Sequence, residues 1–568
     1  MDKQKFPIQS KPSNRAVVRG ETFRLSLFDD FQKSFREIIN RKLFASIFAK
    51  MPLAIIIVIS LILRVIAAGQ SQGFVHPDEV FQTVEMVHYR IFGKYGSGQT
   101  IPWEYRLSSE YGGARSWFFV FVLAVVYRFV MALGISDPFL LIFSARLFLS
   151  LTSIITVFVA YFFGKEAFNE KVGLINAFLC GTWWFFPFWA SRTMTDSPAS
   201  DFLFLSTFLL YKAIKNREKN KESVFLAFSA GAMLGIAFMM RFPSALLGIP
   251  LLIFALIPAI KELRGYFNER KNSPVNLREL IPPLSNAISF CIGSFLLVVV
   301  QGFLDLFTWG SFLHSPINFF MYNVVEGYSS RHGTAPWYSY IAGFFTEFGH
   351  YFLILFIIFF AIGVYFSRKK PKTLGLILAL IFYWIVIFSL IAHKEFRFIM
   401  AILPIGMTLV ATGISKLASS LKQRSFRYLT LTLILATFVT SSVVVGVYQK
   451  NFMWTFNSGI CNAMYWTGQQ EDVERVIVFE NVWYTGGYSY LHKNISCDFI
   501  KINILDPPEA SFNSSYCRML YRYKGTYVIV RGYELWMVVG TLESFNLTFQ
   551  AEVYGNPSAY VFAQESSF

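Results

Sequence analysis

The chain has 568 residues, of which 54% are hydrophobic and only 15% are charged. Ordinary soluble domains carry about a quarter of charged residues, so this composition excludes a soluble globular protein and favours many membrane-spanning segments. The net charge of +16 does not indicate nucleic-acid binding, because the basic residues lie mostly in short loops between apolar runs, which is the topology signal of a membrane protein.

The N-terminal segment 1–43 is polar and basic, and it carries no cleavable signal pattern. Within it, residues 21–40 favour a short amphipathic helix lying on the membrane surface. The first apolar run, at 43–68, is long enough to cross a hydrocarbon core of about 30 Å. Because basic residues precede this run, we expect the N-terminus in the cytoplasm and residues 73–82 on the opposite, outer side.

Further apolar runs follow in the chain near 116–134, 138–163, 172–190, 198–214, 224–240, 243–260, 284–308, 338–366, 373–392, 396–417 and 426–448. Basic loops of membrane proteins lie preferentially on the cytoplasmic side. If every run crossed the membrane, four basic stretches would lie on the outer side instead: 212–221, 261–278, 368–372 and 416–427. We therefore interpret 116–134 as a re-entrant or surface-lying part of a large first outer loop, about 69–137. The predicted fold is a polytopic α-helical membrane domain, residues 44–448, with about eleven transmembrane helices.

This topology places four polar segments on the outer face, at 73–115, 191–197, 309–337 and 393–397. The charge argument did not use the identity of these segments, so their convergence independently supports one shared outer site. The alternative explanation is that outer loops are simply where polar residues occur.

Residues 449–568 differ in composition, with short β-like runs at 475–479, 527–531 and 559–563 between Gly, Pro and Asn turns. We expect a small C-terminal α/β domain on the outer side of the membrane. Glycosylation sequences at Asn494, Asn513 and Asn546 are compatible with that location.

Five cysteines are present. Cys180 and Cys291 lie in apolar runs, and we expect both to be packed and unreactive. Cys461, Cys497 and Cys517 allow one disulfide and one free thiol, but their spacing does not fix the pairing. No metal-ligand spacing is present.

The segment His76-Pro77-Asp78-Glu79 stands at the mouth of the first span, where charged groups cost less than they do inside lipid. Pro77 suits the first turn of a helix, and acidic residues are favourable at that end. Because consecutive side chains point in different directions, one catalytic base with a supporting neighbour is more economical than two carboxylates facing one sugar. An acidic helix start without a catalytic purpose is the alternative.

Two further outer segments combine charges with a membrane boundary. In 191–198, Arg192 suits a phosphate, whereas Asp196 equally suits a cap for the next helix, with Pro198 in its first turn. The segment 393–398 places four ionisable groups between two apolar spans, which is expensive unless a polar cavity receives them: His393, Lys394, Glu395 and Arg397.

The remaining outer segment, 328–338, combines a permanent cation with an imidazole. Arg331 and His332 suit a lipid phosphate. Trp337 and Tyr338 suit stacking on a sugar ring, and equally suit a position at the membrane interface.

Together these segments predict a carboxylate base beside a hydroxyl, with cations around a departing phosphate. The sequence has no phosphate-binding loop and no dinucleotide fingerprint, which argues against a nucleotide-driven pump and gives no support to a nucleotide-sugar donor. A polyprenyl-phosphate sugar suits a site at the membrane boundary better.

At these residues the chain resembles the GT-C glycosyltransferases of family 22, the dolichyl-phosphate-mannose-dependent mannosyltransferases that build N-glycan precursors and glycosylphosphatidylinositol (GPI) anchors. His76-Pro77-Asp78-Glu79 resembles the family's first-loop signature, and His393-Lys394-Glu395-Phe396-Arg397-Phe398 resembles its His-Lys-Glu-x-Arg-Phe pattern. Residues 192–197 resemble Arg-Thr-x-x-Asn-Ser, with Asp196 in place of Asn. Residues 333–338 resemble Gly-Thr-His-Pro-Trp-His, with Ala335 and Tyr338 in place of the two histidines.

The resemblance implies an inverting mannosyltransferase that acts at the outer or lumenal face, in the endoplasmic reticulum membrane of a eukaryote or the plasma membrane of an archaeon. It implies Asp78 as the base, with Glu79 beside it, and neither a metal nor another cofactor. Its partners would be the lipid bilayer, a dolichyl-phosphate-mannose donor and a lipid-linked glycan acceptor. The expected substrate-binding residues are His76, Trp103, Arg115, Arg192, Asp196, Arg331, His332, Trp337, Tyr338, His393, Lys394, Glu395 and Arg397.

Two alternatives stay open from the sequence. One is a GT-C enzyme that uses another polyprenyl-phosphate sugar. The other is a secondary transporter or lipid flippase, which the many spans allow, although broken helices in matching repeat positions are not visible. The acceptor, the linkage position and the oligomeric state are not encoded in any pattern that we identify.

Overall fold

The computed structural model describes residues 51–217, 220–269, 277–500, 525–533, 535, 542 and 547–564. The chain divides into two compact units, residues 1–56 and 57–568, and the site and the sheet described below belong to the second. The surface helix expected at 21–40, the glycosylation sequence at 513–515 and Cys517 lie outside the described residues.

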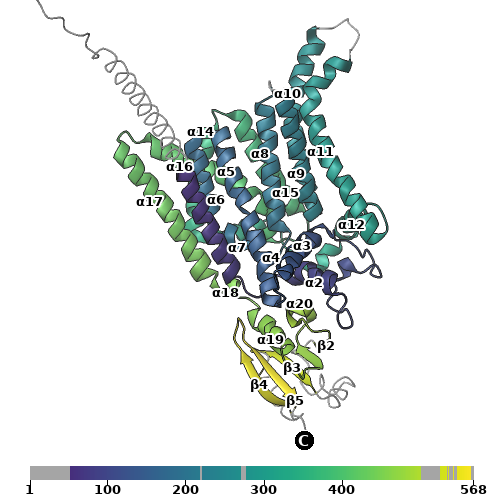
Figure 1. Cartoon of the computed structure of the whole chain (residues 1–568). Coiled ribbons are helices and arrows are strands. Elements are labelled where there is room, and N and C mark those ends of the chain that lie inside the picture. The colour runs from purple at the N-terminus through teal and green to yellow at the C-terminus, as the bar shows by residue number, and fades with distance from the viewer. Residues whose placement is uncertain are drawn as a thin grey trace, which may run out of the picture. The chain divides into compact units, whose positions relative to one another are not determined.

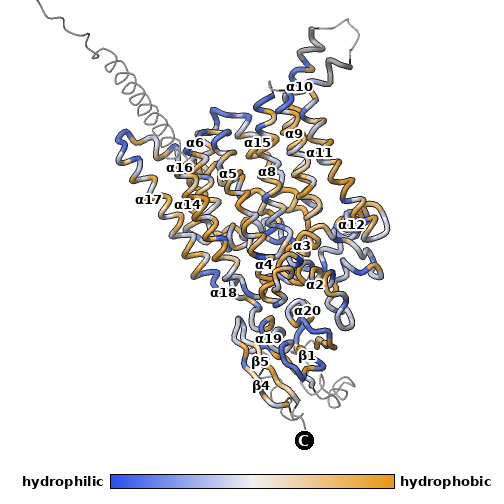
Figure 2. Tube along the Cα trace, viewed as in Figure 1, coloured by the Kyte–Doolittle hydropathy of each residue, from blue (hydrophilic) through white to orange (hydrophobic). Residues whose placement is uncertain are grey.

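Long apolar helices make up most of the second unit, and hydrophobic residues follow them along their length (Figures 1 and 2). In the part of the chain that the structure describes, nine helices are long and apolar enough to cross a membrane: Met51–Gln70, Pro138–Ala167, Lys221–Met240, Phe242–Arg264, Pro282–Trp309, His350–Ser367, Pro371–Leu390, Phe396–Ser420 and Arg424–Gln449. Each overlaps an expected span, but the run expected at 338–366 is divided at Gly349, and only its second part, His350–Ser367, forms such a helix.

Several of these spans consist of two or more consecutive elements. The individual bounds are α4 Pro138–Thr152, α5 Ile154–Ala167, α9 Asn220–Met240, η3 Phe242–Leu247, α10 Gly248–Glu269, α11 Leu277–Trp309, α14 His350–Ser367, α15 Pro371–Leu390, η6 Phe396–Ile402, α16 Leu403–Ser420, α17 Arg424–Val443 and η7 Val444–Gln449.

The two other expected spans, 172–190 and 198–214, are helical but less regular. The first consists of α6 (Glu170–Thr182) and α7 (Phe185–Ala190), which are separated at Trp183 and Trp184. The second is α8 (Asp196–Lys215), which carries two aspartates and two lysines. The run at 116–134 forms α3 (Phe118–Ala132), whose 15 residues extend only about 22 Å, less than the hydrocarbon core.

The segment that carries His393 to Arg397 leads directly into the most buried span. In Phe396–Ser420, 94% of the apolar window is buried inside the protein. Glycines allow the neighbouring helix to approach closely: a Cβ atom on Gly413 would lie 2.0 Å from the carbonyl oxygen of Phe359, and one on Gly363 would lie 1.9 Å from that of Leu409. This close packing holds α16, the helix that follows the segment 393–398, against α14.

The outer segments fold into short helices. The first loop contains η1 (Val80–Val84), α2 (Glu85–Phe92) and η2 (Trp103–Tyr105). The segment between α11 and α14 contains α12 His314–Phe320, η4 Met321–Val325, η5 Tyr328–His332 and α13 Ser339–Phe348.

The C-terminal region contains a five-stranded sheet in the order β2-β1-β3-β5-β4. Its elements are α18 Asn451–Trp454, α19 Ser458–Gly468, β1 Arg475–Phe479, η8 Val482–Tyr484, α20 Gly487–Leu491, β2 Ser496–Phe499, β3 Thr526–Arg531, β4 Leu547–Val553 and β5 Ala559–Gln564. β1 pairs in parallel with β2 and β3, whereas β5 pairs antiparallel with β3 and β4. The three predicted strands are confirmed, and β2 and β4 were not predicted.

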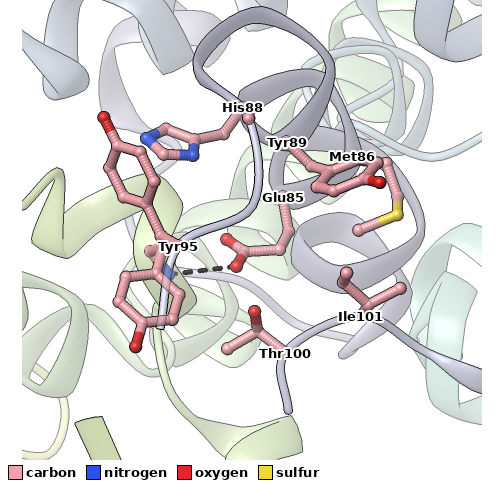
Figure 3. Close-up of a pocket in the computed structure, with 9 residues that line it drawn as sticks. Glu85, Met86, His88, Tyr89, Tyr95, Thr100 and Ile101 are labelled. Carbon is pink, nitrogen blue, oxygen red and sulfur yellow. Dashed lines mark hydrogen bonds between the residues drawn. The ribbon is translucent and has the colours of Figure 1, made fainter. Parts of the chain in front are cut away.

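A buried carboxylate joins the first loop to the C-terminal region. Glu85 on α2, labelled in Figure 3, accepts hydrogen bonds from the backbone N–H groups of Tyr488 at 3.1 Å and Ser489 at 2.7 Å, at the N-terminal end of α20. Gly487 leaves room for this carboxylate, because a Cβ atom there would lie 2.7 Å from it. Unpaired N–H groups at a helix start favour negative charge, which accounts for the contact.

The four described cysteines are free thiols, and Cys517 lies outside the described residues. Cys180 is buried, as expected. The expectation that Cys291 is packed is wrong, because its side chain is exposed on α11, whose outward face presents apolar residues such as Ile292 and Phe295.

Candidate active site

Arg397 is the centre of the site and joins three carboxylates. Its Nη2 donates to Oδ2 of Asp78 at 2.8 Å, its Nε donates to Oε2 of Glu395, and its Nη1 lies 3.6 Å from Oδ2 of Asp196. The planar guanidinium offers five donors in a fixed fork, so one side chain can hold several acceptors at once. Arg397 therefore brings together the first loop, the start of α8 and the segment 393–398.

His76 lies between two of these carboxylates. Its Nδ1 is 3.4 Å from Oδ2 of Asp78, and its Nε2 is 3.6 Å from Oε1 of Glu395. Burial alone would lower the pKa of His76, but the charge of Asp78 and hydrogen bonds to both carboxylates outweigh burial and raise the pKa to about 9. At neutral pH the imidazole is therefore charged and forms a second cation beside Asp78.

Asp78 is one of two carboxylates in the cluster that remain partly accessible, the other being Glu395 at 21% exposure. It begins a helical turn directly after Pro77, whose carbonyl accepts the N–H groups of Val80 and Phe81. Its side chain is 22% exposed. Burial would raise the pKa of Asp78, but the charges of His76 and Arg397 outweigh burial and hold it well below the ordinary range. Asp78 is thus an ionised acceptor at the surface of the site.

The segments 333–335 and 393–395 are held together by polar side chains. Nε2 of His393 lies 2.8 Å from Oε1 of Glu395, and its Nδ1 lies 3.0 Å from the carbonyl of Gly333. Lys394 donates through Nζ to the carbonyls of Ala335 at 2.9 Å and Ile391 at 2.5 Å. Glu395, which pairs with both His393 and Arg397, has a lowered pKa because those partners outweigh its burial.

Asp196 does not cap α8. The structure records no capping hydrogen bond at this helix start, and the carboxylate instead pairs with Arg397 and, through Oδ1, with Nη1 of Arg241. Asp196 is 4% exposed, so two arginines compensate its buried charge. The capping alternative from the sequence is wrong, and the residue belongs to the charged cluster.

Glu79 points away from that cluster. Its side chain is 1% exposed, and its Oε1 accepts the backbone N–H groups of Val75 at 2.7 Å and His76 at 3.1 Å. Its Oε2 lies 3.6 Å from Nη1 of Arg192, which is fully buried. The guanidinium of Arg192 donates to the backbone carbonyls of Gln72, Met453 and Trp454. Most polar atoms of both side chains are thus engaged by the protein itself, although Oε2 of Glu79 and Nε of Arg192 have no hydrogen-bond partner among the described residues.

A further cation, Arg115, and a further carboxylate, Glu104, lie within electrostatic reach of Asp78. Burial raises the pKa of Glu104; Arg115 opposes this rise, and the charge of Asp78 adds to it. Glu104 accepts a hydrogen bond from Nε2 of Gln82 at 2.9 Å. Arg115 lies over the Phe319 ring at 5.9 Å, and its Nε is buried without a hydrogen-bond partner among the described residues.

Aromatic residues form the rim of the site. Trp103 stacks on Tyr322 at a centroid distance of 4.1 Å, and the hydroxyl of Tyr322 lies 3.2 Å from Nε2 of His332. The rings of His332 and His393 are 6.2 Å apart, which links this rim to the charged cluster. Arg331 is exposed and lies over the Tyr328 ring at 3.7 Å.

Trp337 and Tyr338 are not brought into the cluster. Their side chains are 69% and 52% exposed, and their rings contact each other at 5.7 Å. Among the described residues no group of three His, Cys, Asp or Glu side chains is arranged to hold a metal ion. The carboxylates converge on an arginine instead.

Sequence reasoning missed three residues of the site: Arg241, Glu104 and Tyr340. Arg241 directly follows the span at 224–240, so the topology argument already placed it on the same face as the other residues of the site. Tyr340 is 2% exposed, and its hydroxyl has no hydrogen-bond partner among the described residues. Burial raises the pKa of Tyr340, and Arg241 and Glu395 are its charged neighbours, so it lies beside the cluster although no sequence pattern indicates this.

The arrangement can accept a proton from a hydroxyl and stabilise a developing anion in the same step. Asp78 is an ionised oxygen acceptor that can receive a proton, and the cations around it can stabilise an anion that develops nearby. These are the two requirements for displacing a phosphate-linked group by a hydroxyl.

Comparisons with known proteins identify the family of the chain. Residues 55–492 match the model of the Alg9-like mannosyltransferase family. The chain is 24% identical over 467 residues to mouse "GPI alpha-1,2-mannosyltransferase 3", covering 81% of this chain and 75% of the mouse protein. The chain is 26% identical to the human protein of the same name, over 64% of this chain and 58% of the human protein. The chain is 24% identical to Arabidopsis thaliana "Mannosyltransferase APTG1", over 77% of this chain and 75% of that protein.

Solved structures show the same fold at low sequence identity. ArnT from Cupriavidus metallidurans bound to undecaprenyl phosphate has a TM-score of 0.56 at 11% identity, covering 91% of this chain and 99% of ArnT. AglB from Archaeoglobus fulgidus, in complex with an inhibitory peptide and a dolichol-phosphate, has a TM-score of 0.51 at 14% identity, covering 87% and 70%. The predicted GT-C fold is confirmed. The chain belongs to the Alg9-like mannosyltransferase family and is a glycosyltransferase.

Proposed function

We propose that this protein transfers mannose from a dolichyl-phosphate-linked donor to a lipid-linked glycan, with inversion, at the outer face of the membrane. In a eukaryotic cell this face is the lumenal side of the endoplasmic reticulum. The observation that carries the proposal is the ionised, accessible Asp78, held by Arg397 and His76. The names of the relatives support a GPI precursor as the acceptor.

In the proposed step, Asp78 receives the proton of an acceptor hydroxyl. The hydroxyl oxygen forms a bond to the anomeric carbon of mannose while the bond from that carbon to the phosphate oxygen breaks. The electron pair of the broken bond leaves with dolichyl phosphate. Attack opposite to the leaving group inverts the anomeric centre, so a β-linked donor gives an α-mannoside.

Arg115 is the cation best suited to the leaving phosphate. No ion pair occupies its guanidinium among the described residues, and its Nε is buried without a partner. Arg192 also has a buried Nε without a partner, but it differs in its two Nη atoms, which backbone carbonyls and the carboxylate of Glu79 already occupy. A buried donor without a partner costs free energy until a ligand satisfies it, and a phosphate oxygen would do so.

Donor binding also makes Asp78 a stronger base. In the free protein the charges of His76 and Arg397 hold the pKa of Asp78 far below neutral, which disfavours proton uptake. A donor phosphate that approaches these cations reduces the positive potential at Asp78. The pKa of Asp78 then rises toward the working pH only when the donor is present.

The transporter alternative loses its basis, because the chain belongs to a glycosyltransferase family. The remaining alternative is a different polyprenyl-phosphate sugar, which the experiment below distinguishes. The proposed mechanism assigns all charge neutralisation to side chains of the protein.

The test reconstitutes the purified protein in liposomes with a lipid donor and a lipid-linked acceptor. Two donors are compared, dolichyl-phosphate-mannose and dolichyl-phosphate-glucose, each with a GPI precursor and with an N-glycan precursor. We expect mannose transfer to the GPI precursor only. Transfer of glucose instead would overturn the donor, and transfer to the N-glycan precursor alone would overturn the acceptor.

The matched experiment in cells is mass spectrometry of lipid-linked glycans after removal of the protein. We expect a truncated GPI precursor to accumulate. Unchanged GPI precursors together with a truncated N-glycan precursor would contradict the proposed acceptor.

A further inference from the structure

The backbone that carries Asp78 runs beside a segment from the other end of the chain. The N–H group of Gln72 donates to the carbonyl of Trp454 at 2.7 Å, and that of Phe74 donates to the carbonyl of Phe456 at 2.9 Å. Gly73 lies between them with a φ of +57°, and a Cβ atom on it would lie 2.1 Å from the Phe456 oxygen. The first loop is therefore seated closely against residues 453–457, which we name the seat segment.

Arg192 fastens the two sides of this contact. It donates through Nη2 to the carbonyl of Met453 at 2.5 Å and through Nη1 to that of Gln72 at 3.4 Å. Its Nη1 also pairs with Glu79, whose carboxylate holds the N–H groups of the two residues before Pro77. One buried guanidinium thus connects the seat segment with both ends of the turn that presents Asp78.

Asn457 connects the same turn with the C-terminal sheet. Its Nδ2 donates to the carbonyl of Phe74 at 3.2 Å, and its Oδ1 accepts from Nη2 of Arg531 on β3 at 3.0 Å. Its backbone is left-handed, with a φ of 59°, a conformation in which asparagine is favoured over most residues. Arg531 in turn pairs with Glu480 and donates to the carbonyl of Tyr484.

We infer that the seat segment and the C-terminal sheet position the catalytic turn, and that Asn457 and Arg192 are positioning residues that act through the backbone of residues 72–79 without touching substrate. This inference rests on the proposed function, in which Asp78 is the base. It assigns the C-terminal sheet a role in catalysis, although part of that sheet lies beyond the residues that match the family model.

Asn457→Asp separates the two contacts of this residue. Aspartate keeps an oxygen for Arg531 and tolerates the left-handed backbone, but it cannot donate to the Phe74 carbonyl and places an oxygen against it. The matched control is Asn462→Asp, because Asn462 is half-buried on α19, donates to the carbonyl of Tyr554, and has no hydrogen bond to residues 72–79 among the described residues.

The experiment measures kcat, KM for donor and acceptor, and amide hydrogen exchange of residues 72–79 in the purified full-length protein. For Asn457→Asp we expect kcat to fall about 10- to 100-fold, because a shift of the order of 1 Å in a catalytic group costs this much. KM should stay within about twofold of wild type, and exchange at 72–79 should rise. Asn462→Asp should match wild type in all three measurements.

An unchanged kcat for Asn457→Asp, or a loss of kcat without faster exchange at 72–79, would overturn the inference. A second variant, Asn457→Gly, removes both contacts while keeping the left-handed backbone accessible, and it should reproduce the effect if Asn457→Asp does not fold. The exchange measurement does not depend on activity. If exchange at 72–79 is faster in Asn457→Asp while Asp78→Asn keeps full activity, the proposed base is wrong and the positioning role of the seat segment stands.

Discussion

Asp78 and Glu79 are consecutive acidic residues in one turn, yet they belong to two different regions of the molecule. Asp78 faces the charged cluster of His76, Glu395 and Arg397 and is partly exposed. Glu79 faces the buried seat, where it holds backbone N–H groups and pairs with Arg192. The difference shows that an acidic pair at a membrane boundary can divide into one reactive group and one group that positions it.

The same division separates the arginines. Arg397 is surrounded by carboxylates at the site, and Arg192 is surrounded mainly by backbone carbonyls behind it. A cation that is bound to carbonyls is fixed in one position, so it can hold the chain. A cation that is bound to carboxylates can exchange them for a phosphate, so it can respond to a substrate.

The largest expected effect is the loss of activity in Asp78→Asn. Removal of the general base should lower kcat about a thousandfold, within the usual contribution of acid–base catalysis. Arg397 retains Glu395 and Asp196 as partners, so we expect the melting temperature to change little. The transfer assay and a thermal melt of the same preparation check both statements, and activity above about a tenth of wild type would contradict them.

The next effect is expected for Arg397→Lys. Lysine keeps the charge but cannot reach three carboxylates from one planar group, so Asp78 and Asp196 lose fixed partners. We expect kcat/KM to fall about a hundredfold, which is roughly 2.7 kcal/mol of transition-state stabilisation. Arg368→Lys, on a basic segment away from the site, is the matched control and should behave like wild type. Equal activities would show that a single positive charge is sufficient.

The main effect of Glu79→Gln should be a lower stability of the folded protein. The amide oxygen can still accept the N–H groups of Val75 and His76, but the buried charge of Arg192 loses its carboxylate partner. Breaking a buried pair in this way typically costs about 3 kcal/mol. A thermal melt should show the loss, whereas the kcat of the folded fraction should fall less than tenfold. A Glu79→Gln protein that is stable but inactive would show that Glu79 takes part in catalysis, which contradicts its positioning role.

The order of the outer segments and the fold class follow from the sequence, because charge bias and apolar length are properties of local stretches. The placement of Arg192 does not follow, since an arginine at a span boundary looks the same whether it binds phosphate or backbone carbonyls. The placement of Asp196 does not follow either, because an aspartate at a helix start looks the same whether it caps the helix or pairs with arginines, here Arg241 and Arg397.

The seat segment was also not predictable. The contacts of Gln72 and Phe74 with residues more than 350 positions later are tertiary, and no local pattern records them. Arg241 was missed for a related reason, because it stands alone between two apolar residues. The strands β1, β3 and β5 were predictable because alternating or continuous β-branched runs are local.

The smallest expected effect is the pH dependence of stability from His76. Its pKa is raised to about 9 in the folded protein, above the ordinary value of 6.5. The stabilisation is therefore fully present below pH 6.5 and is lost as the pH rises to about 9. His76→Gln should lack this dependence, with a difference of at most about 1 kcal/mol because the side chain is partly exposed. Thermal melts of both proteins between pH 6 and 10 check the prediction, and parallel curves would contradict it.

The most direct test of the division between Asp78 and Glu79 is the single-turnover rate of mannose transfer per folded molecule, measured side by side for Asp78→Asn and Glu79→Gln at saturating donor. We predict that Asp78→Asn is at least about a hundredfold slower than Glu79→Gln. Equal rates, or a slower Glu79→Gln protein, would contradict the assignment of the catalytic base to Asp78.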